Sequence, residues 1–576
     1  MSIFRKGSDE SRPTLDEWMG IPDRIEAVGN RVVLHGSPGT GKTSKIIEWI
    51  VNVLKDNPNA SVLYLVYNRR MMDEMRNRLR EAMHGEISDG KLEGTVLTMH
   101  SFFKRKLGIP SDRLANEARS QWARKKGLTV KRKDKDSSGG NLRDVELDDS
   151  DRFFEMYDYS RAQSKKLSLK ETPQYKGRTE GLQYDPDRMA ASWERLKRRK
   201  GIYDFVDILR LAANGRKINY AEFQWQLVAI DEAQDLTPIM WKLADKLGSR
   251  AEYVCFAGDD KQAIYSFQGI DVGKFLKHMK GAKVLELQLS FRLPIEIWTE
   301  AKRIENEIKT KFITGFTHNG RRGKVLTLDT IENFLKTDGS GKWILVWTNS
   351  QARAIGYELM KLGYIYKTIN PNHSGYSPWD QEDMVMATNI LQAYISGKML
   401  NERDFSFLLE HVPSGTEAAK GENAPEIGQL REMLRTKDIK KIRESFGSGF
   451  PGKFIDNSRF TDMQKRALKA LKAGTLVTSE NTIYMDTIHS VKGDENDLVA
   501  VVKRVPWQVD KGLKGSQEER DNVFRVFYVA VTRAKNVLVH LCVEDLKTDR
   551  NFEYLLEPGS NGTRGDQVQG ERRGDA

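Results

Sequence analysis

Short apolar runs alternate with segments of helical periodicity along most of the chain. The first run, Val32 to Leu34, leads into a glycine-rich loop, and a segment with apolar residues at helical spacing begins at Ser44. A second run at 61–67 precedes a helical pattern at 68–80. Continuous apolar runs of this length are typical of buried strands, and a 3.6-residue period is typical of amphipathic helices. The alternation predicts an α/β fold.

The same pattern returns twice, with an interruption each time. Residues 103–201 are polar, basic and helical in pattern, and 373–479 are mostly helical without a nucleotide motif. A strand-terminal Thr-x-His-Ser occurs at 98–101 and again at 487–490, which is consistent with two related cores. The other apolar runs lie at 227–230, 253–257, 284–287, 343–347, 481–486, 498–502 and 537–543.

We expect two cores, each carrying a helical insertion. The second core is expected to begin near the apolar run at 284–287. The tail is rich in Gly, Arg, Gln and Asp, a composition that predicts disorder. The expected division is 1–102 and 202–281 for core one, 103–201 for its basic insertion, 282–372 and 480–555 for core two, 373–479 for its insertion, and 556–576 for the tail.

Length and charge narrow the class of protein. A chain of 576 residues suggests about three to five domains. The formal net charge is +12, and basic residues cluster at 104–135 and 195–200. A solvated helix face explains such runs as well as a nucleic-acid surface does, and a nuclear-import signal is a third possibility. Their position beside a nucleotide motif favours nucleic acid.

Several features predict a soluble, cytoplasmic protein. No apolar run approaches the roughly 20 residues that span a bilayer, and residues 1–20 are polar and carry acids, unlike a signal peptide. Cys255 and Cys542, the two cysteines, lie in apolar runs and are expected to be small core residues in a reducing compartment. A zinc module is excluded on this count.

The glycine-rich loop matches the GxxxxGK[ST] pattern of phosphate-binding loops. Such a loop lets backbone N–H groups and a helix N-terminus face phosphate oxygens. Lys42 is expected to reach the terminal phosphates and Thr43 to hold Mg²⁺, whereas the alternative is a plain glycine-rich turn before a helix. The loop residues are Gly36, Ser37, Pro38, Gly39, Thr40, Gly41, Lys42 and Thr43.

A carboxylate pair follows four apolar residues at 227–230. A nucleotide hydrolase needs one carboxylate for Mg²⁺ and a second for the attacking water, and we assign Asp231 to the metal and Glu232 to the water. An isolated Asp-Glu pair at a strand end is more often a helix cap. The sequence Ala233-Gln234-Asp235 that follows makes the pair far more specific.

Three motifs closely resemble those of the UvrD/Rep/PcrA-like helicases of superfamily one. They are Asp231-Glu232-Ala233-Gln234-Asp235, the segment at 258–267 and the segment at 527–535; further matches lie at 68–79, 98–102, 204–209, 289–292 and 487–495. The resemblance covers the cores and hardly reaches the insertions. It implies an α/β fold of two RecA-like P-loop cores in tandem, each interrupted by a mainly helical inserted domain, with ATP and Mg²⁺ in the cleft between them.

The resemblance also implies roles for single residues of both cores. Arg292 and Arg533 match arginine fingers that reach the γ-phosphate, although a surface salt bridge is the alternative for each. Gln262 matches the glutamine that senses the γ-phosphate, Glu495 matches the carboxylate that accepts the ribose hydroxyl, and Phe291 would stack on the base unless it is a core residue.

The expected DNA track carries aromatic and hydroxyl side chains. Bases stack on aromatic rings without selection among them. The matching positions are Tyr67, His100, Ser101, Phe267 and His489; a core role is equally open for each aromatic.

The loop and the adenine site depart from the pattern of the family. Pro38 is commoner in other phosphate-binding loops, and the upstream glutamine that reads adenine is not visible, with Arg24 near its place. Selectivity for ATP over other triphosphates therefore stays open.

These observations predict an ATP-dependent DNA helicase that moves along single-stranded DNA, 3′ to 5′ by resemblance, and unwinds duplex DNA in replication or repair. Its expected partners are single-stranded DNA and single-strand/duplex junctions, and it is expected to be a monomer or weak oligomer without a membrane partner. The alternatives are a translocase that displaces proteins with little unwinding, and an ATP-gated DNA-binding or loading factor.

Overall fold

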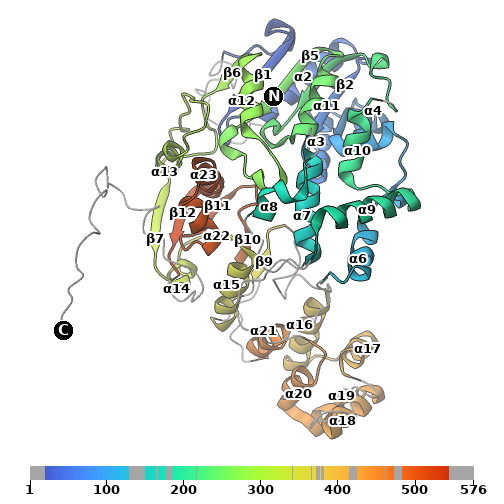
Figure 1. Ribbon diagram of the computed structural model, residues 1–576. Helices are drawn as coiled ribbons and strands as arrows, with labels where there is room; N and C mark the ends of the chain where they lie inside the picture. Colours follow the sequence, from blue (N-terminus) through green and yellow to red (C-terminus); the bar gives the residue numbers. More distant parts are fainter. Residues whose placement is uncertain are drawn as a thin grey trace, which may run out of the picture.

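Two parallel sheets with helices on both faces organise the protein (Figure 1). The computed structural model describes residues 20–128, 149–163, 167–176, 184–215, 217–339, 341–362, 364, 366–370, 377, 382–413, 424–460, 462–472 and 483–543. The two sheets confirm the predicted α/β fold. The tail at 556–576, and residues 129–148 of the expected basic insertion, lie outside the described residues.

The first sheet has six strands in the order β3-β2-β4-β5-β1-β6. All its pairings are parallel, and Val33 of the central strand β1 lies opposite Phe256 on one side and Val284 on the other. The strands are β1 (Arg31–Gly36), β2 (Val62–Val66), β3 (Val96–Thr98), β4 (Trp225–Ile230), β5 (Ala251–Gly258) and β6 (Lys283–Leu287).

Alternation of side chains along the strands gives this sheet two buried faces. Val32 and Leu34 pack under α2, α3 and α4, whereas Val33 packs under α5, α10, α11 and α12. The helices are α2 (Lys42–Asp56), α3 (Arg69–Ala82), α4 (Asp89–Thr95), α5 (Met99–Lys106), α10 (Phe205–Ala213), α11 (Pro238–Gly248) and α12 (Val272–Lys280).

One expected boundary between the cores is wrong. The sequence placed the apolar run at 284–287 at the start of core two, but β6 pairs with β1 in the first sheet. An apolar run shows that a strand is buried and does not show which sheet it joins. The chain passes to the second core only after Leu287.

Helices between β3 and β4 form a small body beside the first sheet (Figure 1). Trp122, Phe153 and Trp193 are buried in its own apolar core. Asp204, at the start of α10, accepts hydrogen bonds from Arg119 Nε at 2.8 Å and Trp193 Nε1 at 2.9 Å, and these join the body to core one. The helices are α6 (Asn116–Lys125), α7 (Asp149–Ala162), α8 (Pro173–Lys176) and α9 (Pro186–Lys200).

The second sheet also has six parallel strands, in the order β7-β12-β11-β8-β10-β9. Helices α13 and α23 cover one face, and α14 and α15 pack on the other. The elements are β7 (Lys324–Leu328), β8 (Trp343–Val346), β9 (Tyr366–Thr368), β10 (Ile483–Thr487), β11 (Asn496–Val502), β12 (Ala534–Leu541), α13 (Ile295–Glu307), α14 (Ile331–Leu335), α15 (Asn349–Lys361), α22 (Trp507–Leu513) and α23 (Gln517–Val531).

A helical body between β9 and β10 extends away from the second sheet, at the bottom of Figure 1. Its apolar core is continuous with that under α15. The helices are α16 (Glu382–Ile395), α17 (Glu402–His411), α18 (Ala424–Thr436), α19 (Ile439–Phe446), α20 (Phe450–Asp456) and α21 (Asp462–Lys472).

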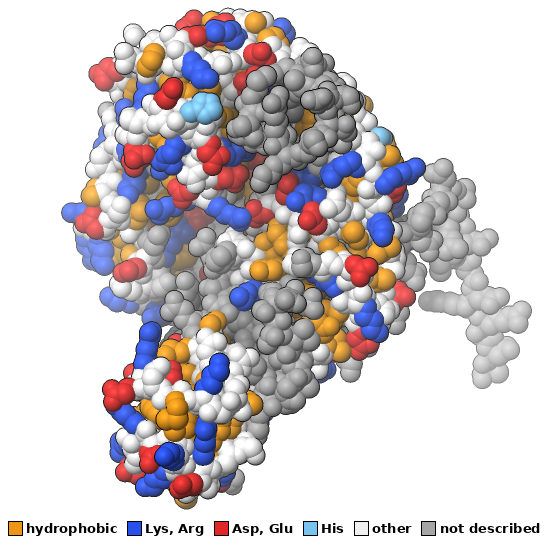
Figure 2. Space-filling model, turned by 180° about the vertical axis from the view of Figure 1, so that it is seen from behind, with side chains coloured by type: hydrophobic (Ala, Val, Ile, Leu, Met, Phe, Trp, Pro, Cys, Tyr) orange, Lys and Arg blue, Asp and Glu red, His pale blue; other side chains and the backbone are white. Residues whose placement is uncertain are grey.

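The surface is charged without being uniformly basic. On the face in Figure 2, Lys and Arg side chains are interspersed with Asp and Glu over both the large upper part and the lower helical body. Among the described residues, no helix combines the length and the apolar character needed to cross a bilayer.

Candidate nucleotide site and nucleic-acid interface

The glycine-rich loop joins β1 to α2 in the centre of the first sheet. Gly39 and Gly41 have φ of +72° and +85°, a region that glycine enters at little cost. The ammonium of Lys42 is buried and donates to the backbone oxygens of Gly36 at 2.6 Å and Ser37 at 3.3 Å. Burial lowers the pKa of Lys42, and nearby carboxylates oppose that shift. The loop therefore holds the positively charged ammonium of Lys42 at its centre.

Asp231 lies directly beside the first turn of α2. Its Oδ2 accepts hydrogen bonds from Thr43 Oγ1 and from Tyr64 Oη, both at 2.9 Å. Burial, followed by the neighbouring Glu232, raises the pKa of Asp231. A hydroxyl and a carboxylate in contact, next to a phosphate-type loop, are the oxygen donors that suit Mg²⁺.

Glu232 has a strained backbone. Its φ of +50° and ψ of +42° lie in the left-handed region, which costs a non-glycine residue of order 1–3 kcal/mol. The side chain accepts a hydrogen bond from Gln234 Nε2. Burial acts to raise the pKa of Glu232, but Lys492 and Lys42 outweigh it and lower that pKa. A carboxylate held ionised in a fixed position can orient or deprotonate water.

Residues 290–292 of the chain lie directly on the glycine loop. Ser290 Oγ donates to Pro38 O, and Phe291 N donates to Gly39 O, each at 2.8 Å. A Cβ on Gly39 would meet Arg292 Cβ at 2.4 Å, so this position has no room for a side chain. The contact fixes Arg292 beside the loop.

Arg533, at the start of β12, reaches core one from core two. It is buried, and its Nη2 donates to Gln262 Oε1 at 3.1 Å. Gln262 in turn donates from Nε2 to Asp259 Oδ2 at 2.9 Å. Burial and then the neighbouring Arg292 lower the pKa of Arg533 to about 9. Two close guanidinium groups in a buried site are stabilised by an anion between them.

The residues present fit ATP with Mg²⁺. Lys42, Arg292 and Arg533 supply cations, and Nε of Arg292 is buried without a hydrogen-bond partner among the described residues. The Thr43 hydroxyl and the Asp231 carboxylate are oxygen donors of the kind that could hold the metal ion. This donor set matches the charge distribution of a metal-bound triphosphate.

Phe291 and Glu495 lie at the open side of this site. Phe291 is 36% exposed, so its ring is available for stacking. Glu495 is half exposed and forms an ion pair with Arg292. Arg24 forms an ion pair with Asp56, the last residue of α2. Asp56 lies about 20 Å along the helix from the glycine loop. The arginine is therefore not directed at the loop.

Three of the residues expected on the DNA track meet around Tyr265. Tyr67 stacks on Tyr265 with ring centroids 5.4 Å apart and an interplanar angle of 11°. Phe267, 49% exposed, and His489 each pack against Tyr265 at about 6 Å, and Tyr265 Oη donates to His489 O at 3.0 Å. The cluster spans both cores and ends in one exposed ring.

His100 and Ser101 lie in the first turn of α5, where they contact neighbouring residues of core one. His100 packs edge-on against Phe205 at 5.7 Å, and Ser101 N donates to Thr98 Oγ1 at 3.1 Å in the helix cap. Burial lowers the pKa of His100, and also that of His489, to about 4. Both imidazoles are therefore neutral at physiological pH.

Lys492 and Asp235 are site residues that the sequence reasoning did not single out. Lys492 forms an ion pair with Asp235, donates to Gln262 O at 2.6 Å, and lies over the Tyr265 ring at 5.1 Å. Burial raises the pKa of Asp235 to about 7 against the opposing effect of Lys492. Both residues lie in motifs that the sequence identified, Asp235 at 231–235 and Lys492 at 487–495, and this position was the sequence feature that could have indicated their role.

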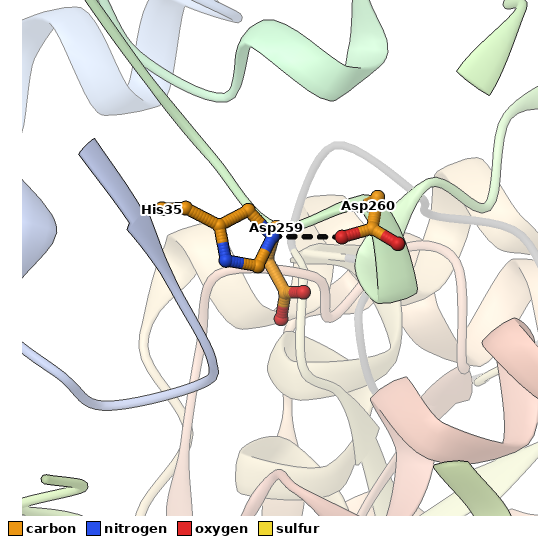
Figure 3. A group of neighbouring side chains, drawn as sticks. All are labelled: His35, Asp259 and Asp260. Carbon is orange, nitrogen blue, oxygen red and sulfur yellow. Dashed lines mark hydrogen bonds and ion pairs between the residues drawn. The ribbon is translucent and has the colours of Figure 1, made fainter. Parts of the chain in front are cut away.

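His35, Asp259 and Asp260 lie together where the paired strands β1 and β5 end (Figure 3). His35 Nε2 is 2.7 Å from Asp260 Oδ1, and all three residues are fully buried. The buried ammonium of Lys261 lies 3.3 Å from Asp259 Oδ1 and supplies positive charge to the cluster. Lys261 offsets part of the negative charge of the cluster, which links β1 to the turn that carries Gln262, and we assign no metal to it.

The fold and this site define a class of protein: a P-loop nucleotide-binding protein with two α/β cores whose phosphate loop meets arginines of the second core. Comparison with protein-family models identifies the family of the chain. The UvrD/REP helicase N-terminal domain matches residues 22–283, and the UvrD-like helicase C-terminal domain matches 396–544. The two matches together cover more than half of the chain, which belongs to the UvrD/Rep helicase family.

Curated relatives are similar to the chain over very different lengths. A probable DNA helicase II homolog of Rickettsia conorii is 30% identical over 170 residues, 28% of this chain and 24% of that protein. RecBCD enzyme subunit RecB of Mycobacterium tuberculosis is 27% identical over 315 residues, 44% of this chain and 28% of RecB. ATP-dependent DNA helicase PcrA of Staphylococcus aureus strain MRSA252 is 23% identical over 620 aligned positions, 90% of this chain and 82% of PcrA. The chain thus spans about a quarter of the first two relatives.

Proposed function

We propose that the protein is a DNA-dependent ATPase that moves along single-stranded DNA and separates duplex strands. The observation that carries the proposal is the contact of Arg533 with Gln262 across the two cores. It joins a cation of core two to the core-one turn that also leads to Tyr265 and Phe267. Names of relatives, among them ATP-dependent DNA helicase PcrA, support the same activity.

In the ATPase step, Lys42, Arg292 and Arg533 stabilise the charge that develops on the γ-phosphate. Glu232 orients the attacking water and accepts its proton. Thr43 and Asp231 would hold Mg²⁺, which would supply positive charge against the phosphates. Phe291 stacks on the base, and Glu495 accepts the ribose hydroxyl.

Hydrolysis is coupled to the DNA track through residues 259–267. The side chain of Gln262 accepts a hydrogen bond from Arg533, and the backbone oxygen of Gln262 accepts one from Lys492. Tyr265 Oη donates a hydrogen bond to His489 O. Loss of the γ-phosphate removes the anion that draws Arg292 and Arg533 towards core one, and the contact of Arg533 with Gln262 remains. The resulting motion of the cores changes the spacing of Tyr67, Phe267 and His489, and so changes the grip on the bases. His100 and Ser101 contact the strand farther along core one.

We propose 3′ to 5′ polarity on the resemblance of residues 258–265 to the UvrD-like motif. The basic insertion between β3 and β4 provides a phosphate-binding surface near the junction. A translocase that displaces proteins with little unwinding shares the whole site, so strand displacement and protein displacement are to be compared on one preparation.

The direct test is ATP hydrolysis with and without single-stranded DNA. We expect strong stimulation by DNA in the wild type, and loss of turnover with retained DNA binding in Lys42→Ala. Hydrolysis at full rate without DNA would contradict the proposal. A loading factor would instead show ATP-dependent changes in DNA affinity without directional movement.

A further inference from the structure

Arg70 and Asp494 join the two cores outside the nucleotide contacts. Nη1 and Nη2 of Arg70 each lie 2.7 Å from one carboxylate oxygen of Asp494. Arg70 is in the first turn of α3 in core one, and Asp494 lies between β10 and β11 in core two. A bidentate arginine–carboxylate ion pair fixes the relative orientation of the two side chains as well as the distance between them.

The segment that carries Asp494 also holds both arginines of the nucleotide site. The backbone oxygen of Asp494 accepts a hydrogen bond from Arg533 Nη1 at 3.0 Å. The next residue, Glu495, forms the ion pair with Arg292. Gly493 precedes them with φ of +98°, a region that glycine enters at little cost. Arg70 contacts this segment from core one, as do Asp235 and Gln262 through Lys492.

We infer that Arg70 and Asp494 form an inter-core clamp that positions Arg533 and Arg292 for hydrolysis. In this inference, which rests on the proposed function, Arg70 is a positioning residue and touches neither nucleotide nor reacting water. The side chain of Arg70 is 53% exposed and that of Asp494 is 21% exposed. The clamp can therefore open and re-form as the cores move, and high salt weakens it.

A competing role for Arg70 is a phosphate contact with DNA, since it lies three residues after Tyr67 in the same core. The two roles differ in their dependence on Asp494. A clamp needs both partners and tolerates their exchange. A phosphate contact needs the positive charge at position 70 and gains nothing from an arginine at 494.

The test is a charge-exchange cycle in the full chain. Arg70→Asp and Asp494→Arg are each expected to lower kcat of DNA-stimulated hydrolysis about fivefold to tenfold, and the double exchange is expected to recover most of that loss. Arg80→Ala is the matched control, because Arg80 is on the same helix and pairs with Asp89 at 2.8 Å within core one. We expect the control to keep the wild-type kcat.

A second measurement follows the clamp without relying on catalysis. Dyes on Lys55→Cys in core one and Glu332→Cys in core two, in a Cys542→Ser background, report the separation of the cores by energy transfer. Each single exchange should reduce the fraction of molecules in which the two cores lie close together, and the double exchange should restore that fraction. If the wild type hydrolyses ATP without DNA stimulation, the proposed function fails, while this measurement still decides the clamp.

Two results would overturn the inference. One is a double exchange with no recovery, in which the losses of the single variants simply add in both measurements. The other is a fall in affinity for single-stranded DNA in Arg70→Asp that Asp494→Arg does not share, which would assign Arg70 to the DNA.

Discussion

Arg292 and Glu495 form an ion pair, with Nη2 of the arginine 2.5 Å from Oε2 of the glutamate. We expect the arginine to contact the γ-phosphate and the glutamate to contact the ribose, at opposite ends of the nucleotide. The pair must therefore break when ATP binds. Arg292 is mostly buried and Glu495 is 42% exposed, so the glutamate is the partner that can swing away.

Glu495→Ala should remove discrimination between ATP and 2′-deoxy-ATP. In the wild type, a carboxylate that accepts the ribose hydroxyl should favour ATP by about threefold to tenfold in KM, as for a partly exposed charged hydrogen bond. Steady-state hydrolysis with both nucleotides measures the ratio. Asp497→Ala, an exposed acid two residues away, is the control. An unchanged ratio in Glu495→Ala would place the ribose elsewhere.

Arg533→Lys should not substitute for the native residue. The lysine keeps one charge but cannot contact Val529 O, Asp494 O and Gln262 at once, as the guanidinium does at 2.9–3.1 Å. We expect kcat to fall on the order of 10³-fold, as for loss of an arginine finger. Rapid-mixing assays at saturating DNA measure it. A loss below about tenfold would make Arg533 a structural residue.

Phe267→Ala should weaken binding of single-stranded DNA. A stacked base is worth about 1–3 kcal/mol, which corresponds to roughly fivefold to 150-fold in Kd. Phe267→Trp should retain affinity, because it keeps a ring face at this exposed position. Fluorescence anisotropy with a labelled oligonucleotide gives both values. Equal affinities for the alanine variant and the wild type would remove Phe267 from the track.

Stability should fall as pH falls from about 6.5 to 4. The folded pKa values of His100 and His489 are lowered to about 4, whereas an unfolded histidine has a pKa near 6.5. In this window the unfolded chain binds more protons, so protonation favours unfolding; the stabilisation is complete above pH 6.5. Thermal unfolding of His100→Gln and His489→Gln should show a shallower loss of Tm than the wild type.

The exposed His84 provides the control for this pH series. His84→Gln should keep the wild-type dependence of Tm on pH, because its ring is not transferred into the interior on folding. If His100→Gln and His489→Gln also keep that dependence, other groups control acid sensitivity.

The sequence was most informative where the residues of the site are close together along the chain or directly follow an apolar run. The strand before Gly36, the loop and α2 are contiguous, and Asp231 ends a clear apolar run; the structure brings its carboxylate to Thr43. The pairing of Lys492 with Asp235 and of Arg70 with Asp494 joins residues more than 250 positions apart. Such contacts depend on how the cores pack, which no local pattern encodes.

The assignment of β6 shows the same limit at the level of the fold. Its apolar residues predicted a strand correctly, but membership in the first sheet comes from pairing with β1. Strand partners are chosen by the whole sheet, since any buried parallel strand presents similar apolar residues on both faces. The α/β fold class was therefore predictable and the point of passage between cores was not.

Unwinding of a tailed duplex tests the central claim most directly. The substrates carry a single-stranded 3′ tail, a 5′ tail or no tail, and strand release is followed with ATP and Mg²⁺ for the wild type and Lys42→Ala. We predict release of the 3′-tailed duplex by the wild type, much slower release of the other two, and none by Lys42→Ala. Failure of the wild type to release any substrate, or equal release by Lys42→Ala, would contradict ATP-driven strand separation.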